Sequence, residues 1–139
     1  VREVPDHVEA LNLLARIAQG EGDFAAAQQW LDCALQRQPG SPKLAGNRAV
    51  LLEAAGRPGE AIALYEELIA AHPSYMPGYL NLANLEAEAG DWRSAQVHYQ
   101  QALELVPGSS VALDRLVALL RKHDQPRLAQ EYALRYGLL

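Results

Sequence analysis

The residues that could do chemistry are few and scattered along this chain of 139 residues. Histidine is the commonest metal ligand outside cysteine sites, and two histidines four residues apart would share one helix face. No pair here has that spacing. The four histidines are His7, His72, His98 and His123. We therefore predict no metal site.

Nucleophilic catalysis is not indicated either. Cys33 is the one cysteine, so it cannot form an internal disulfide, and no catalytic partner stands near it in the sequence. Ser41, Ser74 and Ser109 or Ser110 stand where helices should begin, so capping explains them without a catalytic role. No glycine-rich phosphate loop exists, and solvated helix faces account for most acidic residues. We expect no catalytic residue and no cofactor.

Composition and charge favour a helical chain that binds neither nucleic acid nor membrane. Half of the residues are hydrophobic, 21% are charged, and alanine and leucine dominate. The formal net charge is −5, without a basic run to neutralise phosphates or an anionic membrane surface. No apolar stretch approaches the ~20 residues that span a bilayer.

A repeat with a single fixed period is the strongest signal in the sequence. Three sets of identical residues recur along the chain, one of alanines, one of glycines and one of prolines, and we call each set a column. Successive members of every column are separated by the same number of residues, which is the interval from Ala27 to Ala61. The columns are Ala27, Ala61, Ala95 and Ala129; Gly22, Gly56 and Gly90; and Pro39, Pro73 and Pro107. Three columns with one period predict tandem copies of a single structural unit.

Each period divides into two helical halves. The first half carries apolar residues with the i, i+3, i+4, i+7 spacing of an amphipathic helix, as in Leu113, Leu116, Val117 and Leu120. Glycine then ends that helix. The second helix begins at a capping aspartate or a proline, at Asp23, Pro58, Asp91 and Pro126. Small residues such as Ala15 and Ala27 let the paired helices approach closely.

This pattern resembles the tetratricopeptide repeat (TPR) family. The matching residues are Asn81-Leu82-Ala83, Gly90-Asp91-Trp92, Ala95, Tyr99, Ala102 and Pro107. The resemblance covers nearly the whole chain. It implies an all-α fold, a right-handed α-solenoid of about four tandem antiparallel helix pairs, whose first helices line a concave groove.

We expect a single domain over residues 1–139, with repeats at 8–41, 42–75, 76–109 and 110–139. The proline column extends back to Pro5, so residues 1–7 should be the tail of a preceding repeat and the chain a piece of a longer array. Three residues depart from the pattern. Arg48 and Glu86 interrupt apolar columns, and either pair with one another or reach for the rim. Asp124 replaces the turn glycine of the last repeat.

The polar stripe of the first helices is the expected binding surface. Asn47 and Asn81 stand one period apart, and their amides could bind the backbone of an extended chain. The alternative is that asparagine is simply tolerated near the start of these helices. The TPR proteins that serve protein-glycosylating transferases carry such asparagine ladders. The candidate groove residues are Asn12, Arg16, Asn47, Asn81, Asn84, Glu88 and Arg115.

A second TPR subtype clamps the terminal carboxylate of chaperones. We do not predict this clamp, because Asn12 and Arg16 stand where it needs a lysine and an asparagine, and Pro77 and Asn81 occupy its later basic positions.

The sequence thus predicts a non-catalytic module that binds an extended peptide or a partner protein along the groove. The alternatives are a structural or self-assembly scaffold, or the adaptor region of a larger enzyme such as a protein glycosyltransferase. Uncapped leucines on the last helix predict self-association through that helix or a missing cap domain. They are Leu128, Leu134, Leu138 and Leu139.

Overall fold

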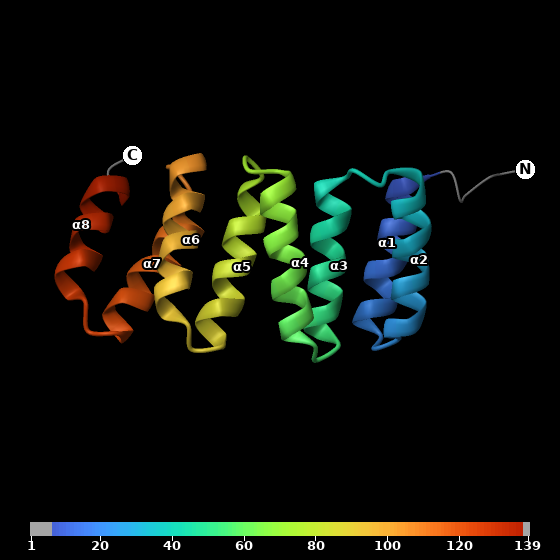
Figure 1. The fold of residues 1–139 in the computed structure, drawn as a ribbon, viewed down its shortest axis with the longest axis horizontal. Coiled ribbons are helices and arrows are strands. Elements are labelled where there is room, and N and C mark those ends of the chain that lie inside the picture. Colours follow the sequence, from blue (N-terminus) through green and yellow to red (C-terminus); the bar gives the residue numbers. More distant parts are fainter. Residues whose placement is uncertain (1–6, 138–139) are drawn as a thin grey trace, which may run out of the picture. The chain divides into compact units, whose positions relative to one another are not determined.

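The computed structural model describes residues 7–137, which form eight α-helices in sequential antiparallel pairs (Figure 1). The predictions for residues 1–6, Leu138 and Leu139 lie outside this range. The helices are α1 Val8–Gly20, α2 Phe24–Arg37, α3 Pro42–Ala54, α4 Pro58–Ala71, α5 Met76–Glu88, α6 Trp92–Leu105, α7 Ser110–Lys122 and α8 Pro126–Gly137. The all-α fold of repeated helix pairs is confirmed.

The chain divides into two compact units. Unit 1 comprises residues 1–68 and unit 2 comprises residues 69–139, so the boundary falls inside α4. Within unit 1, α2 packs against both α1 and α3. Within unit 2, α6 packs against both α5 and α7, and α7 packs against α8. The complete hairpins are therefore α1–α2 in unit 1 and α5–α6 and α7–α8 in unit 2.

Helix starts follow the capping pattern of the sequence. The side chains that accept a hydrogen bond from a backbone N–H of the first turn belong to Asp23, Ser41, Asp91 and Ser109. Pro58 and Pro126 are the first residues of α4 and α8. The prediction for Ser74 is wrong. Tyr75 is the N-cap of α5 and makes no side-chain cap, because the turn continues one residue further.

Alanine fills the tightest positions between paired helices. Ala27, Ala95 and Ala129 have no exposed surface, as predicted for the alanine column. Ala15 is 5% exposed opposite Ala27, on the partner helix of its hairpin. A larger side chain at these positions would force the helix axes apart, and overpacking of this kind destabilises a core.

Larger apolar side chains complete one core in each unit. The core of unit 1 is formed by Leu11, Ala15, Ala18, Ala27, Leu31, Ala34, Leu44 and Leu51. The core of unit 2 is formed by Tyr79, Ala83, Ala95, Tyr99, Ala102, Leu103, Ala112, Leu116, Leu119, Leu120, Ala129 and Tyr132. The i, i+3, i+4 stripes of the sequence are therefore the buried faces of the helices.

The three residues that depart from the repeat pattern, Arg48, Glu86 and Asp124, have different environments in the structure. Arg48 is exposed and lines an open hollow of about 510 Å³ with Asp32 and Glu60. Glu86 is 6% exposed, and its Oε1 lies 2.6 Å from Nδ1 of His98. The suggested pair of Arg48 and Glu86 falls in different units and stays a prediction. Asp124 takes a positive φ of 59°, so it adopts the left-handed turn of the glycine it replaces.

Candidate functional site

In unit 1 the polar face of the first helices is organised by two asparagines. Nδ2 of Asn47 on α3 donates to Oδ1 of Asn12 on α1 at 2.7 Å. Asn12 is only 6% exposed, so the hydrogen bond satisfies an amide that would otherwise be costly to bury. Asn47 is half-buried. The bond ties α1 to α3 and holds the Asn47 amide in one orientation.

A small hollow of about 100 Å³ lies next to this pair. Glu9 from α1 and Lys43 from α3 line it together with Asn12, and both charged residues are exposed. Arg16 follows on α1, one turn after Asn12, and is also exposed. Unit 1 thus presents both signs of charge beside a fixed pair of amides.

In unit 2 the predicted groove residues gather around the hydroxyl of Tyr99. This hydroxyl, from α6, donates to Oδ1 of Asn84 on α5 at 2.5 Å. Burial raises the pKa of Tyr99, and the guanidinium of Arg115 on α7 lowers it in part by charge and hydrogen bonding. The carboxylates of Glu88 and Glu86 raise the pKa further. Arg115 and Glu88 therefore both lie close to the phenol.

A hollow of about 280 Å³ opens above this cluster. Glu88, Arg115 and Lys122 supply exposed charges around it, while Tyr99 and Leu119 are buried residues of its lining. Two cations and one carboxylate thus surround a surface that is apolar at its base. Such a hollow can accept one polar or acidic side chain while its charged rim stays hydrated.

Three of the seven predicted groove residues are thus brought together in unit 2, namely Asn84, Glu88 and Arg115. Asn12 and Asn47 are brought together in unit 1. Asn47 and Asn81 lie in different units, so their spacing as a ladder stays a prediction. Asn81 is half-buried on α5.

The sequence pattern did not reveal the role of the Tyr99 hydroxyl. Its column is apolar, and the ring is indeed buried at 3% exposure. A buried phenol needs a hydrogen-bond partner, and that need was the available signal. The partner is Asn84, which the sequence had assigned to the groove alone.

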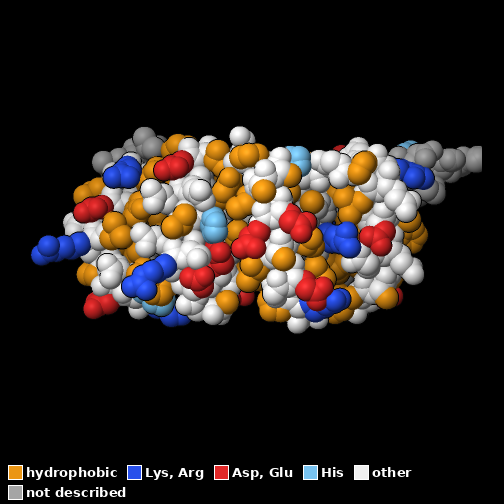
Figure 2. Space-filling view, in the orientation of Figure 1, with side chains coloured by type: hydrophobic (Ala, Val, Ile, Leu, Met, Phe, Trp, Pro, Cys, Tyr) orange, Lys and Arg blue, Asp and Glu red, His pale blue; other side chains and the backbone are white. Residues whose placement is uncertain are grey.

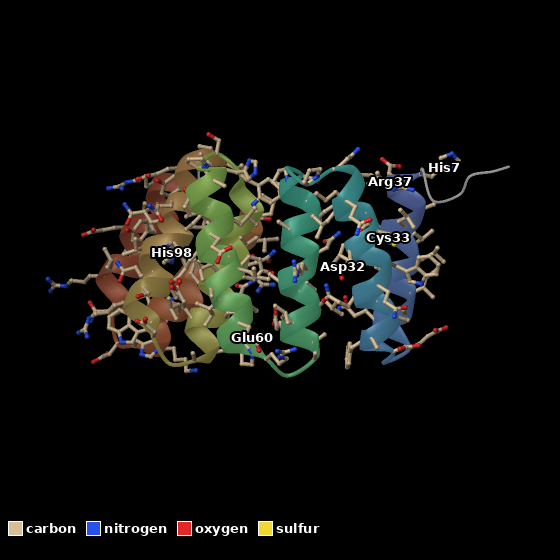
Figure 3. The ribbon with its side chains drawn as sticks, turned by 45° about the vertical axis from the view of Figure 1, so that its right-hand side comes forward. His7, Asp32, Cys33, Arg37, Glu60 and His98 are labelled. Carbon is tan, nitrogen blue, oxygen red and sulfur yellow. The ribbon has the colours of Figure 1, made fainter. Side chains whose placement is uncertain are left out.

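Neither a metal cluster nor a membrane span is found in the part of the chain that the structure describes. Among residues 7–137, no group of three or more His, Cys, Asp or Glu side chains could hold a metal ion. Within the same range, no helix is long and apolar enough to cross a membrane. Acidic and basic side chains are interspersed with apolar ones on the face shown in Figure 2. Cys33 is exposed on α2, next to Asp32 (Figure 3).

Comparison with known proteins identifies the family. The tetratricopeptide repeat model matches residues 19–85 and 52–120, which together cover most of the chain. The chain belongs to the tetratricopeptide repeat family. Repeats of this family form protein–protein interaction modules, and they also occur as parts of larger enzymes.

Relatives and solved structures agree with this assignment. The mouse protein O-mannosyl-transferase TMTC1 is 33% identical over 125 residues, which are 87% of this chain but 13% of that protein. MamA has a TM-score of 0.77 at 18% identity, covering 96% of this chain and 78% of its own. The first TPR of Spaghetti (RPAP3), bound to an HSP90 peptide, has a TM-score of 0.72 at 19% identity, covering 84% of this chain and 93% of its own. These structures share the fold.

Proposed function

We propose that the chain binds an extended polypeptide along the polar faces of its first helices, α1, α3, α5 and α7, and contributes no catalytic residue. The cluster in unit 2 is the observation that carries this proposal. Asn84, Glu88 and Arg115 come from two first helices and meet at the Tyr99 hydroxyl, beside a hollow of about 280 Å³. A structure of the same fold, the first TPR of Spaghetti (RPAP3), is bound to a peptide, which favours a peptide as the ligand.

In this proposal the asparagines bind the peptide backbone. An amide side chain has two donor hydrogens and an acceptor oxygen. Asn47 uses one of its donors on Asn12, which leaves its oxygen and its other hydrogen for a ligand. Asn81, at the same position of the next repeat, would make the equivalent contacts. These contacts would hold a strand without reading its side chains.

Charged residues would select the ligand's side chains. Arg16 is exposed beside the asparagine pair of unit 1. In unit 2, Arg115 and Lys122 favour an acidic side chain, and Glu88 disfavours a second one at the same place. Each hydrogen bond contributes only about 1 kcal/mol, and ordering the peptide costs entropy. We therefore expect micromolar affinity.

The first experiment selects ligands from a phage-displayed library of random peptides and measures their affinity by isothermal titration calorimetry. The double variant Asn47→Ala, Asn81→Ala should weaken binding about tenfold or more, because two sets of backbone contacts are lost. Asn12→Ala is the matched control for Asn47. It removes the same internal hydrogen bond but keeps the proposed contact amide. Unaltered affinity of the double variant would exclude the ladder.

A second pair of variants tests the hollow of unit 2. Arg115→Ala should weaken the binding of those selected peptides that carry an acidic residue. Arg121→Ala should not, because Arg121 is exposed on the same helix but lines a different hollow. Equal losses from both variants would show that only net charge matters and would contradict a defined site.

We also propose a role as the adaptor region of a larger protein-glycosylating enzyme. The similarity to the mouse O-mannosyl-transferase favours it, since it extends over 87% of this chain. In such an enzyme the helical hairpins would hold the acceptor polypeptide near a separate catalytic domain. Deleting them should impair transfer to protein acceptors much more than transfer to short peptides. An equal loss on both acceptors would contradict this role.

A further inference from the structure

A buried tyrosine joins the second helices of two successive hairpins in unit 2. Tyr132 on α8 is 7% exposed, and its hydroxyl donates to Oε1 of Gln100 on α6 at 2.6 Å. The side chain of Gln96, one turn earlier on α6, also hydrogen-bonds to this phenol. The phenol of Tyr132 therefore bridges α6 and α8 from inside unit 2.

Unit 1 lacks a phenol at the equivalent position. Leu64 on α4 stands two periods before Tyr132 and has no polar group to offer α2. Gln28 and Asp32 on α2 stand where unit 2 has its two glutamines, and they bond to one another, with Nε2 of Gln28 donating to Oδ1 of Asp32 at 2.7 Å. Leu64, Gln28 and Asp32 all line the open hollow of about 510 Å³. The place that a phenol bridges in unit 2 is thus accessible in unit 1.

The base of this hollow belongs to positions that are closed in unit 2. Leu52 on α3 is half-buried, whereas Leu120, two periods later, has no exposed surface. Arg48 on α3 is exposed, whereas Leu116, two periods later, is also without exposed surface. A guanidinium and an apolar side chain are therefore both available to a ligand at the base of the hollow.

The charges around the hollow are not equivalent. Arg57 donates from Nε and Nη2 to the carboxylate of Glu60 at 2.5 and 2.8 Å, so these two residues neutralise one another. Arg48 has no hydrogen-bond or ion-pair partner among the described residues of unit 1. Asp32 accepts only the bond from Gln28, and a carboxylate can accept several. Figure 3 shows Asp32 on α2 and Glu60 on α4, with α3 between these helices.

We propose that this hollow of unit 1 is a second binding site, which takes a tyrosine side chain from a partner protein. The phenol donates its hydrogen to Asp32, as the internal phenol of unit 2 donates to α6. The ring lies against Leu52 and Leu64, and the planar guanidinium of Arg48 stacks on its face. Tyrosine and arginine are also the residue types that contribute most often to the centres of protein interfaces.

Other side chains fit this chemistry less well. Phenylalanine offers no donor to Asp32. A carboxylate would attract Arg48 but repel Asp32, and an ammonium group would do the reverse. The hollow shares no lining residue with the one beside Asn12, so this proposal does not depend on a peptide in the groove.

The experiment titrates the chain with three blocked tripeptides that carry tyrosine, phenylalanine or glutamate between two glycines. Methyl NMR of Leu52 and Leu64 reads out the hollow, because an inserted aromatic ring shifts nearby methyl signals upfield. The tyrosine peptide should produce these shifts and bind about tenfold more tightly than the phenylalanine peptide, owing to the bond to a charged acceptor. Unshifted methyls at saturating tyrosine peptide would overturn the proposal. A glutamate peptide that binds as tightly would do so too.

Two variants assign the contacts. Asp32→Ala should remove the preference for tyrosine over phenylalanine, and a preference that persists would contradict the proposed hydrogen bond. Arg48→Leu restores the residue type of Leu116 and should weaken both aromatic peptides about fivefold or more. Arg121→Leu is the matched control, because Arg121 is exposed on α7 and does not line this hollow. Equal losses from Arg48→Leu and Arg121→Leu would exclude a site at Arg48.

Leu64→Tyr supplies the phenol from within the chain, as Tyr132 does in unit 2. The variant should keep its helix content by circular dichroism, melt at or above the temperature of the wild-type chain, and no longer bind the tyrosine peptide. A lower melting temperature would show that the hollow has no room for a phenol, and unchanged peptide binding would show that the peptide binds elsewhere. The Asn47→Ala, Asn81→Ala variant should bind the tripeptide normally, so a failure of the groove proposal leaves this one intact.

Discussion

Asn47 on α3 and Asn12 on α1 form a side-chain hydrogen bond of 2.7 Å between the first helices of two successive hairpins. Asn12 is nearly buried, so its carbonyl has little access to water. A residue that the repeat pattern assigns to a ligand surface therefore also supports the fold.

We predict that this hydrogen bond contributes measurably to stability. Asn47→Ala should lower the free energy of unfolding by about 1–3 kcal/mol, because the Asn12 oxygen stays buried without this donor. Asn12→Ala should cost less, since Asn47 is more exposed. Urea denaturation of both single variants and the double variant gives the coupling energy. Strictly additive losses would show that the bond contributes nothing.

Two glycines should respond to alanine in opposite directions. Gly46 lies inside α3, and an added Cβ would meet only Cδ2 of Leu68, at an ordinary 3.7 Å. Gly46→Ala should raise the free energy of unfolding by about 0.5–1 kcal/mol. Gly56 has a φ of +81°, so Gly56→Ala should lower the free energy of unfolding by about 1 kcal/mol or more. Thermal denaturation measures the stability of both variants. A destabilised Gly46→Ala would mean that the contact with Leu68 is too tight.

Glycine at position 124, in the turn before α8, should stabilise the fold. Asp124 has a φ of 59°, whereas Gly22, Gly56 and Gly90 occupy the same turn position at +81° to +90°. Asp124→Gly removes the strain of a left-handed aspartate, and we expect a gain of up to about 1 kcal/mol. Asp114→Gly in the interior of α7 is the control and should destabilise by about 1 kcal/mol. A similar loss of stability in both variants would show that Asp124 is not strained.

Stability should fall at alkaline pH through Tyr99. Burial raises its pKa above the ordinary value of 10.0, although Arg115 opposes the shift. Below pH 10 both states keep the proton, and the contribution is fully present. As the pH rises above 10, the unfolded state releases its proton first, so stability is lost until the folded pKa is passed. Burial raises the pKa of Tyr132 in the same direction.

Tyr99→Phe isolates this effect. The variant should lose about 1 kcal/mol at neutral pH, since its hydrogen bond to Asn84 is gone. It should also show a shallower decline of stability above pH 10 than the wild-type chain. Urea denaturation at a series of alkaline pH values measures both. An unchanged alkaline slope would indicate that Tyr99 ionises at the same pH in both states.

The fold could be predicted because local rules act at fixed positions of each repeat. Asp23 and Asp91 cap helices, and the alanine at Ala27 and Ala95 is buried without exposed surface. These features depend on neighbours within one hairpin. The prediction that Ser74 caps α5 was wrong, because the turn extends to Tyr75, which is the N-cap. In this turn the hydroxyl of Tyr79 donates a hydrogen bond to the carbonyl of Pro73 at 2.9 Å.

The candidate site was less accessible to sequence reasoning. Spacing placed Asn12 on a polar stripe, but it could not show that Asn47 would satisfy its amide and allow burial. Glu86 is likewise buried at an apolar position, with His98 as a partner from α6. Partner choice between polar side chains depends on rotamers and on distances between helices, and residue types alone do not encode these.

The order of packing within each unit also bears on how the chain folds. Within each unit the helices that pack together are consecutive along the sequence, except that α1 also contacts α3. Contacts between residues close in sequence need little loop closure, and proteins rich in such contacts fold quickly. Each hairpin can therefore begin to form from contacts within its own stretch of sequence, and it becomes stable when the next hairpin packs against it.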